Sequence, residues 1–148
     1  MTATPLGIII VDHGSKRESA NAMLDAFVEQ FAKMHEAEIV EVAHMELAEP
    51  SVAQAFAACV SRGARAVVVC PYFLSPGRHS QKDIPELVEA AAKDFPGVAY
   101  HVAEPIGLHP LMLKVIDDRV SQGREQIQGS PDGARPKPPS TVRMDPTT

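Results

Sequence analysis

The chain has 148 residues and a formal net charge of −5, with 45% hydrophobic and 22% charged residues. These values are ordinary for one globular domain, and the negative charge argues against a nucleic-acid partner. The longest apolar run is far too short to cross a bilayer, and residues 1–5 lack the cationic and apolar regions of a signal peptide. We therefore expect a soluble, cytoplasmic protein without a membrane partner.

The two cysteines, Cys59 and Cys70, show neither the spacing of metal ligands nor that of a disulfide framework. Cys59 falls in an apolar helical pattern and Cys70 at the end of an apolar run. We expect both to be small core residues in a reducing compartment.

The first part of the chain predicts a strand, a helix and a second strand. Residues 6–11 form a continuous apolar run typical of a strand covered on both faces. A helix is expected from about Ser19, and strand character resumes over 39–45. The helix is expected to bury a stripe of residues at helical spacing, namely Met23, Phe27, Phe31 and Met34.

The middle of the chain repeats this alternation. A helix is predicted from Ser51 to Gly63, and a third strand covers 66–70. A loop marked by Pro and Gly, 71–82, leads to a helix that begins near Asp83.

A fourth strand is expected over 98–103, and Pro110 introduces a last helix whose Leu111, Val115 and Ile116 should face the core. Four β-α units in this order predict an α/β fold, an open and mainly parallel sheet with helices on both faces and right-handed crossovers. We expect this sheet and its helices to form a single flavodoxin-like lobe.

The pattern changes near Ser121, where Ser, Gln, Gly and Pro begin to dominate. So few large apolar residues cannot offset the entropy of ordering the chain. We expect an α/β domain over residues 1–120 and a disordered C-terminal tail over 121–148.

Two histidines stand in similar loops, each downstream of a predicted buried strand. His13 lies in the sequence DHGSKR at 12–17, and His79 lies in GRHSQK at 77–82. The carboxyl ends of parallel strands meet at one edge of an open α/β sheet, where ligands bind. The histidines are therefore expected to meet side chains that follow strands two and four, which are His44, Glu46 and Glu104.

Imidazole and carboxylate groups at one edge can bind iron, cobalt, nickel or zinc, and they can also accept protons. The two-residue period of a strand would place His44 and Glu46 on one side and Met45 on the other. The sequence thus predicts a metal site coupled to proton removal.

Cationic and hydroxyl side chains surround both histidines, close to predicted helix N-termini that favour anions. A ligand with carboxylates would suit this cleft. The residues concerned are Ser15, Lys16, Arg17, Arg78, Ser80, Gln81 and Lys82.

Each of these residues also has a structural interpretation. His13, His79 and Glu46 taken singly are compatible with ordinary loop positions, and His44 with a place beneath the loop. The cations are compatible with solubilising charges. The remaining histidines, His35, His101 and His109, are expected to be structural.

Three stretches together carry a family resemblance. They are IIIVDHGS at 8–15, AHMELAEP at 43–50 and PYFLSPGRHSQKDIP at 71–85. In this ordered set the chain resembles the short sirohydrochlorin chelatases, the class II chelatases of siroheme and cobalamin synthesis, over about residues 6–120. Within this family, the residues of the three stretches are most similar to those of the sirohydrochlorin ferrochelatases.

The resemblance implies a ferrochelatase-like α/β fold, a homodimer, and a lyase that inserts a divalent metal into sirohydrochlorin, a polycarboxylate tetrapyrrole. By motif position it assigns His13, His79 and Glu46 as catalytic and metal-binding residues. Iron, cobalt or nickel would be the substrate metal, with no permanently bound cofactor. Plant members carry a cysteine-rich C-terminal segment with an iron-sulfur cluster, and because this tail has no cysteine, no cluster is expected.

Three other functions compete with this interpretation. A receiver-like domain would need a further acidic residue beside Asp12 and a phosphoacceptor Asp after strand three, where the chain has Pro71 and Tyr72. A histidine phosphatase would need an Arg before the His-Gly pair, where the chain has Asp12. A non-catalytic carrier of metal or tetrapyrrole would use the same ligands and stays open, as do the metal and the division of roles between the histidines.

Overall fold

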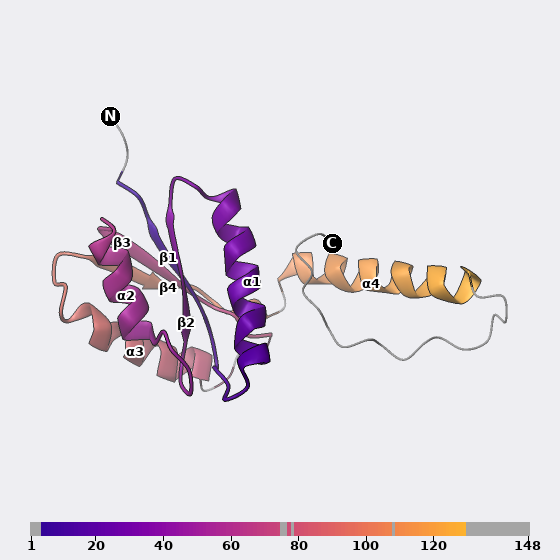
Figure 1. Ribbon diagram of the computed structural model, residues 1–148, viewed down its shortest axis with the longest axis horizontal. Coiled ribbons are helices and arrows are strands. Elements are labelled where there is room, and N and C mark those ends of the chain that lie inside the picture. The colour runs from indigo at the N-terminus through magenta and orange to yellow at the C-terminus, as the bar shows by residue number, and fades with distance from the viewer. Residues whose placement is uncertain (1–3, 75–76, 78, 108, 130–148) are drawn as a thin grey trace. The chain divides into compact units, whose positions relative to one another are not determined.

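A computed structural model of the chain describes residues 4–74, 77, 79–107 and 109–129, apart from the side chains of residues 79 and 80. Strands and helices alternate as expected (Figure 1). Their bounds are β1 Gly7–Asp12, α1 Glu18–Met34, β2 Ile39–His44, α2 Val52–Ser61, β3 Ala66–Pro71, the π-helical turn η1 His79–Asp83, α3 Ile84–Ala92, β4 Ala99–Val102 and α4 Pro110–Gly129.

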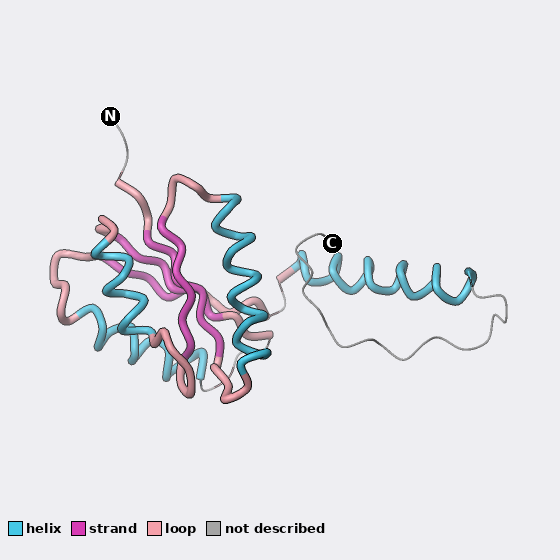
Figure 2. Tube along the Cα trace, in the orientation of Figure 1, coloured by secondary structure: helices cyan, strands magenta, loops and turns pink. Residues whose placement is uncertain are grey.

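The four strands form one parallel sheet in the order β2-β1-β3-β4. Helix α1 covers one face, and α2 and α3 cover the other (Figure 2). The predicted α/β fold with helices on both faces of a parallel sheet is therefore confirmed. Because β1 lies between β2 and β3, the loops that follow these three strands are neighbours at the carboxyl edge.

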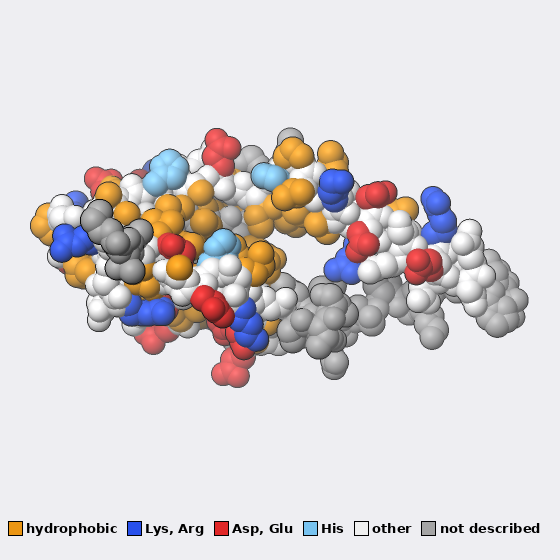
Figure 3. Space-filling view, turned by 90° about the horizontal axis from the view of Figure 1, so that it is seen from above, with side chains coloured by type: hydrophobic (Ala, Val, Ile, Leu, Met, Phe, Trp, Pro, Cys, Tyr) orange, Lys and Arg blue, Asp and Glu red, His pale blue; other side chains and the backbone are white. Residues whose placement is uncertain are grey.

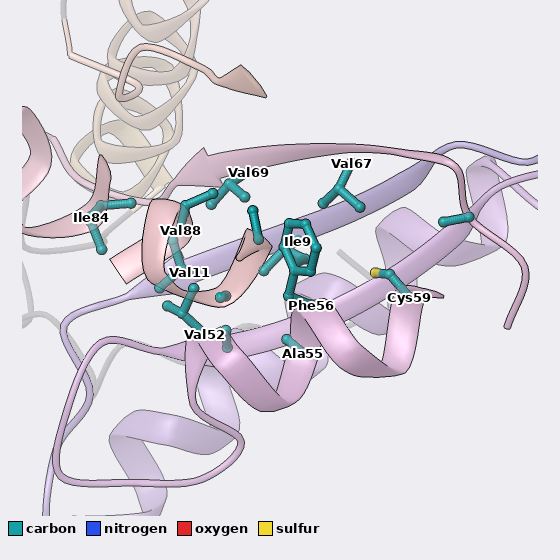
Figure 4. Packing of buried hydrophobic residues seen from close by; sticks show 14 of the residues in the cluster. Ile9, Val11, Val52, Ala55, Phe56, Cys59, Val67, Val69, Ile84 and Val88 are labelled. Atoms are coloured by element: carbon teal, nitrogen blue, oxygen red, sulfur yellow. The ribbon is translucent and has the colours of Figure 1, made fainter. Parts of the chain in front are cut away.

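The alternation of side chains along β1 divides the core into two clusters. Ile9 and Val11 pack with α2 and α3, where Phe56 is completely buried (Figure 4). Ile8 and Ile10 pack with α1. Burial on both faces explains why β1 is a continuous apolar run rather than an alternating one.

Local sequence signals fix the start of α2. Ser51 is its N-cap and accepts a hydrogen bond from the backbone N–H of Gln54, while the Gln54 side chain accepts one from the N–H of Ser51. This capping box satisfies two N–H groups that the helix itself leaves unpaired. The helix consequently begins where the sequence predicted.

The buried stripe of α1 differs from the prediction. The helix buries Leu24 and Val28, supported by the half-buried Phe27 and Phe31, whereas Met23 and Met34 are exposed. The apolar face is therefore centred one residue further along. Leu24 and Val28 lie four residues apart, on the same face one turn from each other.

Helix α4 also differs from the prediction. The expectation that Leu111, Val115 and Ile116 face the core is wrong, since all three are exposed and α4 has no buried residue. The helix belongs to a different unit from the one that contains the sheet.

The predicted loss of regular structure at Ser121 is also wrong as far as Gly129, because α4 continues to that residue. Arg, Glu and Gln over 121–129 have good helix propensity, and no proline interrupts them. The rest of the predicted tail, 130–148, lies outside the described residues. No helix in the described part of the chain is long and apolar enough to cross a membrane.

Candidate active site at the carboxyl edge of the sheet

The structure brings His13 and Glu46 to the same place, although they lie on different loops. His13 directly follows β1, and its carbonyl oxygen accepts a hydrogen bond of 3.0 Å from the backbone N–H of Glu46. The N–H of Met45 donates to the carbonyl of Asp12 at 2.8 Å. Both His13 and Glu46 are exposed. The main chain thus joins these two loops and leaves both side chains accessible.

Gly14 makes this close approach possible. Its φ is +86°, and a Cβ placed there would lie 1.8 Å from the carbonyl oxygen of Glu46. Only glycine tolerates both this conformation and this contact. The His-Gly pair therefore has a structural reason: the glycine admits the backbone of the loop that carries Glu46.

The predicted alternation along 44–46 is wrong. His44 is 1% exposed and Glu46 is exposed, so they do not share one accessible side. Consecutive N–H groups of a regular strand point to opposite sides, yet those of Met45 and Glu46 donate to consecutive carbonyls, of Asp12 at the end of β1 and of His13 after it. The chain bends as soon as β2 ends at His44. His44 lies beneath the loop, as its structural interpretation proposed.

His44 has a partner that the sequence did not reveal. Its Nδ1 donates a hydrogen bond of 2.6 Å to Oδ1 of Asp12, the residue opposite it in the β1–β2 register. A buried imidazole requires such a partner. The sequence did contain a signal for this pair, because Asp12 and His44 are polar residues that each end an apolar strand. Recognising that they are partners required the register between β1 and β2.

Phe73 connects His13 to the loop that follows β3. The two rings have centroids 4.6 Å apart and planes inclined by 52°. Phe73 is buried, and the neighbouring N–H of Tyr72 donates to the carbonyl of Val11 at 2.7 Å. His13 therefore lies between the loop that bears Glu46 and the segment that leads to His79. Phe73 was missed because it reads as an ordinary core residue.

The backbone of residue 79 begins η1, between β3 and α3. The side chains of His79 and Ser80 lie outside the described residues, as does Arg78. Glu104 is exposed and follows β4, which β3 separates from β1.

The loop that leads into α1 is held by its own hydrogen bonds. The N–H of Ser15 donates to Oδ1 of Asn21 at 3.0 Å, and Nδ2 of Asn21 donates to the carbonyl of Ser15 at 2.8 Å. Oγ of Ser15 accepts a bond of 3.0 Å from the N–H of Arg17. Lys16 and Arg17 are exposed beside His13 in sequence. The loop thus presents two cations on a fixed backbone.

The described side chains contain no cluster of three or more His, Cys, Asp or Glu residues able to hold a metal ion, and His79 is not among them. Both cysteines are free thiols. Burial raises the pKa of Cys59 from 9.0 to about 12, with a further contribution from Glu41, and it also raises that of Cys70. Neither thiol has the lowered pKa of a reactive or metal-binding cysteine.

Comparison with known proteins places this edge in context. The chain is 51% identical over 126 residues to the chloroplastic sirohydrochlorin ferrochelatase of Arabidopsis thaliana, covering 85% of this chain and 56% of that protein. It is 30% identical to the sirohydrochlorin ferrochelatase of Priestia megaterium, covering 78% of this chain and 43% of that protein. The chain thus spans about half the length of these relatives.

Solved structures have the same fold. SirB from Bacillus subtilis with Fe3+ aligns with a TM-score of 0.73 at 32% identity, covering 80% of this chain and 47% of that one. A CbiX protein from Marinobacter aquaeolei VT8 aligns with a TM-score of 0.72 at 33% identity, covering 82% and 98%. The CbiX family model matches residues 7–123, which is most of the sequence. The chain belongs to the CbiX family.

Proposed function

We propose that this protein inserts a divalent metal ion, iron or cobalt or else nickel, into sirohydrochlorin, in siroheme or cobalamin synthesis. His13, His79 and Glu46 are the groups that act on the metal and the ring. The hydrogen bond between the Glu46 N–H and the His13 carbonyl carries the proposal, because it holds an imidazole and a carboxylate at one edge of the sheet. Relatives named ferrochelatase and cobaltochelatase support the reaction.

The chemistry follows from charge balance. Two pyrrole N–H protons leave the ring as a divalent cation enters it. Neutral imidazoles ligate the metal and accept protons, and a carboxylate stabilises the charge in transit. The cations Lys16 and Arg17 are exposed on the neighbouring loop and provide partners for the carboxylates of the substrate.

The experiment is an anaerobic absorbance assay of sirohydrochlorin with iron(II), cobalt(II) or nickel(II) and substoichiometric protein. General acid-base catalysis is worth roughly 100- to 10,000-fold in rate, so His13→Ala, His79→Ala and Glu46→Gln should each lower turnover by about that factor. His101→Ala is the matched control, since His101 is an exposed histidine on β4.

Two outcomes would overturn the proposal. Spectral change no faster than in the protein-free control, for every metal, excludes the enzyme. A single equivalent converted per protein molecule favours the carrier of metal or tetrapyrrole instead. Wild-type turnover in His13→Ala removes His13 from the catalytic set.

A homodimer is part of this proposal. One α/β layer system of this size offers only half of a cleft for a tetrapyrrole, and a second copy would supply the other half. Helix α4 exposes apolar side chains at helical spacing, Leu113, Ile116 and Val120, and a second copy of the chain would cover them. Sedimentation at equilibrium should give twice the chain mass of 15.9 kDa; a fully active monomer contradicts this.

The cytoplasm is the compartment we propose. Cys59 and Cys70 are both free thiols, as in a reducing environment. Fractionation of the source cells tests it, and recovery from an organelle would contradict it.

A further inference from the structure

Leu47 combines two unfavourable features in one residue. Its φ is +66°, and no other non-glycine residue in the described part of the chain has a positive φ. A branched apolar side chain rarely adopts this left-handed conformation, which favours glycine or asparagine. The side chain is also 60% exposed. Strain that persists with an apolar group held in water points to a functional requirement.

The surrounding loop holds Leu47 in this conformation. The preceding residue, Glu46, is fixed to the His13 carbonyl through its N–H. On the other side, Pro50 accepts a hydrogen bond of 2.8 Å from the N–H of His44. The segment between Glu46 and Pro50 is therefore anchored at both ends. The anchors keep Leu47 beside the His13 loop.

Other exposed side chains flank His13, which the Glu46 backbone contacts. A second exposed leucine, Leu74, follows Phe73, the residue that packs against His13. Lys16 and Arg17 are exposed on the loop between His13 and α1. Figure 3 looks onto the opposite edge of the unit that contains the sheet, where β1 and β2 begin, and so faces away from these loops. The loops that follow β1, β2 and β3 therefore carry both exposed apolar and exposed cationic side chains. This combination suits a ligand with an apolar face and an anionic rim.

We propose that Leu47 packs against the apolar face of the tetrapyrrole and positions the ring over His13 and Glu46. This inference rests on the proposed function, since a tetrapyrrole with carboxylate arms has both an apolar face and an anionic rim. Leu47 is a positioning residue: it contacts the ring without exchanging protons or ligating metal. The anchors on both sides hold the strained backbone, and the bound ring covers the exposed side chain.

Leu47→Asn is the decisive variant, because asparagine accepts a positive φ but removes the apolar contact. It should raise Tm by about 2–4 °C through relief of strain. It should weaken the Kd for metal-free sirohydrochlorin, measured by absorbance titration, by roughly tenfold or more. Leu47→Met keeps an apolar side chain and should bind within about threefold of wild type. Leu87→Asn changes a leucine on α3 that is 38% exposed and should bind like wild type.

The titration needs no turnover, so failure of the metal-insertion reaction and failure of this inference are separate results. Unchanged binding by Leu47→Asn, or equal loss in Leu87→Asn, overturns the inference even if wild-type protein inserts metal. A lower Tm in Leu47→Asn overturns the strain argument. A wild-type protein that does not bind sirohydrochlorin overturns both proposals, and one that binds without turnover overturns the enzyme alone.

Discussion

Gly14 shows how one residue decides whether two loops can meet. Its φ of +86° is unfavourable for any side chain, and a Cβ at this position would overlap the Glu46 carbonyl. The motif His-Gly-Ser predicted a site at this point of the sequence. It did not predict that the glycine serves the loop of Glu46, because that contact joins residues 32 positions apart (46 − 14).

Gly14→Ala should lower both stability and activity. Strain of this kind costs about 1–3 kcal/mol, and the overlap with a backbone oxygen adds to it because neither loop can yield easily. Gly63→Ala is the control: Gly63 also has a positive φ, +109°, but a Cβ there meets nothing within 4 Å. Urea unfolding should therefore show a larger loss for Gly14→Ala, and metal insertion should fall only in that variant. Equal losses in both variants would mean that the contact with Glu46 is unimportant.

At the level of elements, periodicity predicted each strand end to within one residue but not the path of the chain beyond it. The continuous apolar run of β1 and the helical spacing in α2 and α3 follow directly from burial. The bend after His44 breaks the two-residue period, so a rule valid within β2 placed Glu46 on the wrong side. Helix α4 shows the same limit: its apolar spacing is real, but spacing does not identify what the helix packs against.

The hydrogen bond between Asp12 and His44 links β1 to β2 beneath the candidate site. His44→Phe fills the space but leaves Asp12 without this partner, which should cost about 1–3 kcal/mol of unfolding free energy. Asp12→Asn keeps an acceptor oxygen and should cost less. A double-mutant cycle in urea of His44→Phe with Asp12→Ala, which removes the acceptor, should give a coupling energy of about 0.5–3 kcal/mol.

The exposed pair of Arg62 and Glu41, 2.9 Å apart, is the matched control for this cycle. Its coupling should stay below about 1 kcal/mol because solvent screens it. If the Asp12 and His44 substitutions prove additive, the bond does not stabilise the junction of β1 and β2.

For the whole molecule, the buried thiol of Cys59 predicts how stability depends on alkaline pH. The folded protein keeps this proton up to about pH 12, whereas the thiol of the unfolded chain loses it near 9.0. Unfolding therefore becomes easier as pH rises through this interval, with a slope of at most about 1.4 kcal/mol per pH unit from this group. Below the lower value the contribution is constant.

Urea unfolding of wild type and Cys59→Ala from pH 8 to 11 checks this expectation. The difference between the two curves isolates the thiol from the lysines and tyrosines that titrate in the same range. Wild type should lose more stability than Cys59→Ala above pH 9. Parallel curves would show that the thiol titrates normally in the folded protein.

The sequence by itself determined the α/β class, the parallel sheet and the loops that carry His13 and Glu46. It could do so because burial on one or two faces imposes a regular spacing of apolar residues on each strand and helix. That spacing can be read from a short stretch of sequence. Tertiary structure alone decided the strand order, the pairing of Asp12 with His44, the contact of Gly14 with Glu46 and the exposed, strained Leu47. These depend on backbone bends after strands end and on contacts between distant segments, for which a local period carries no information.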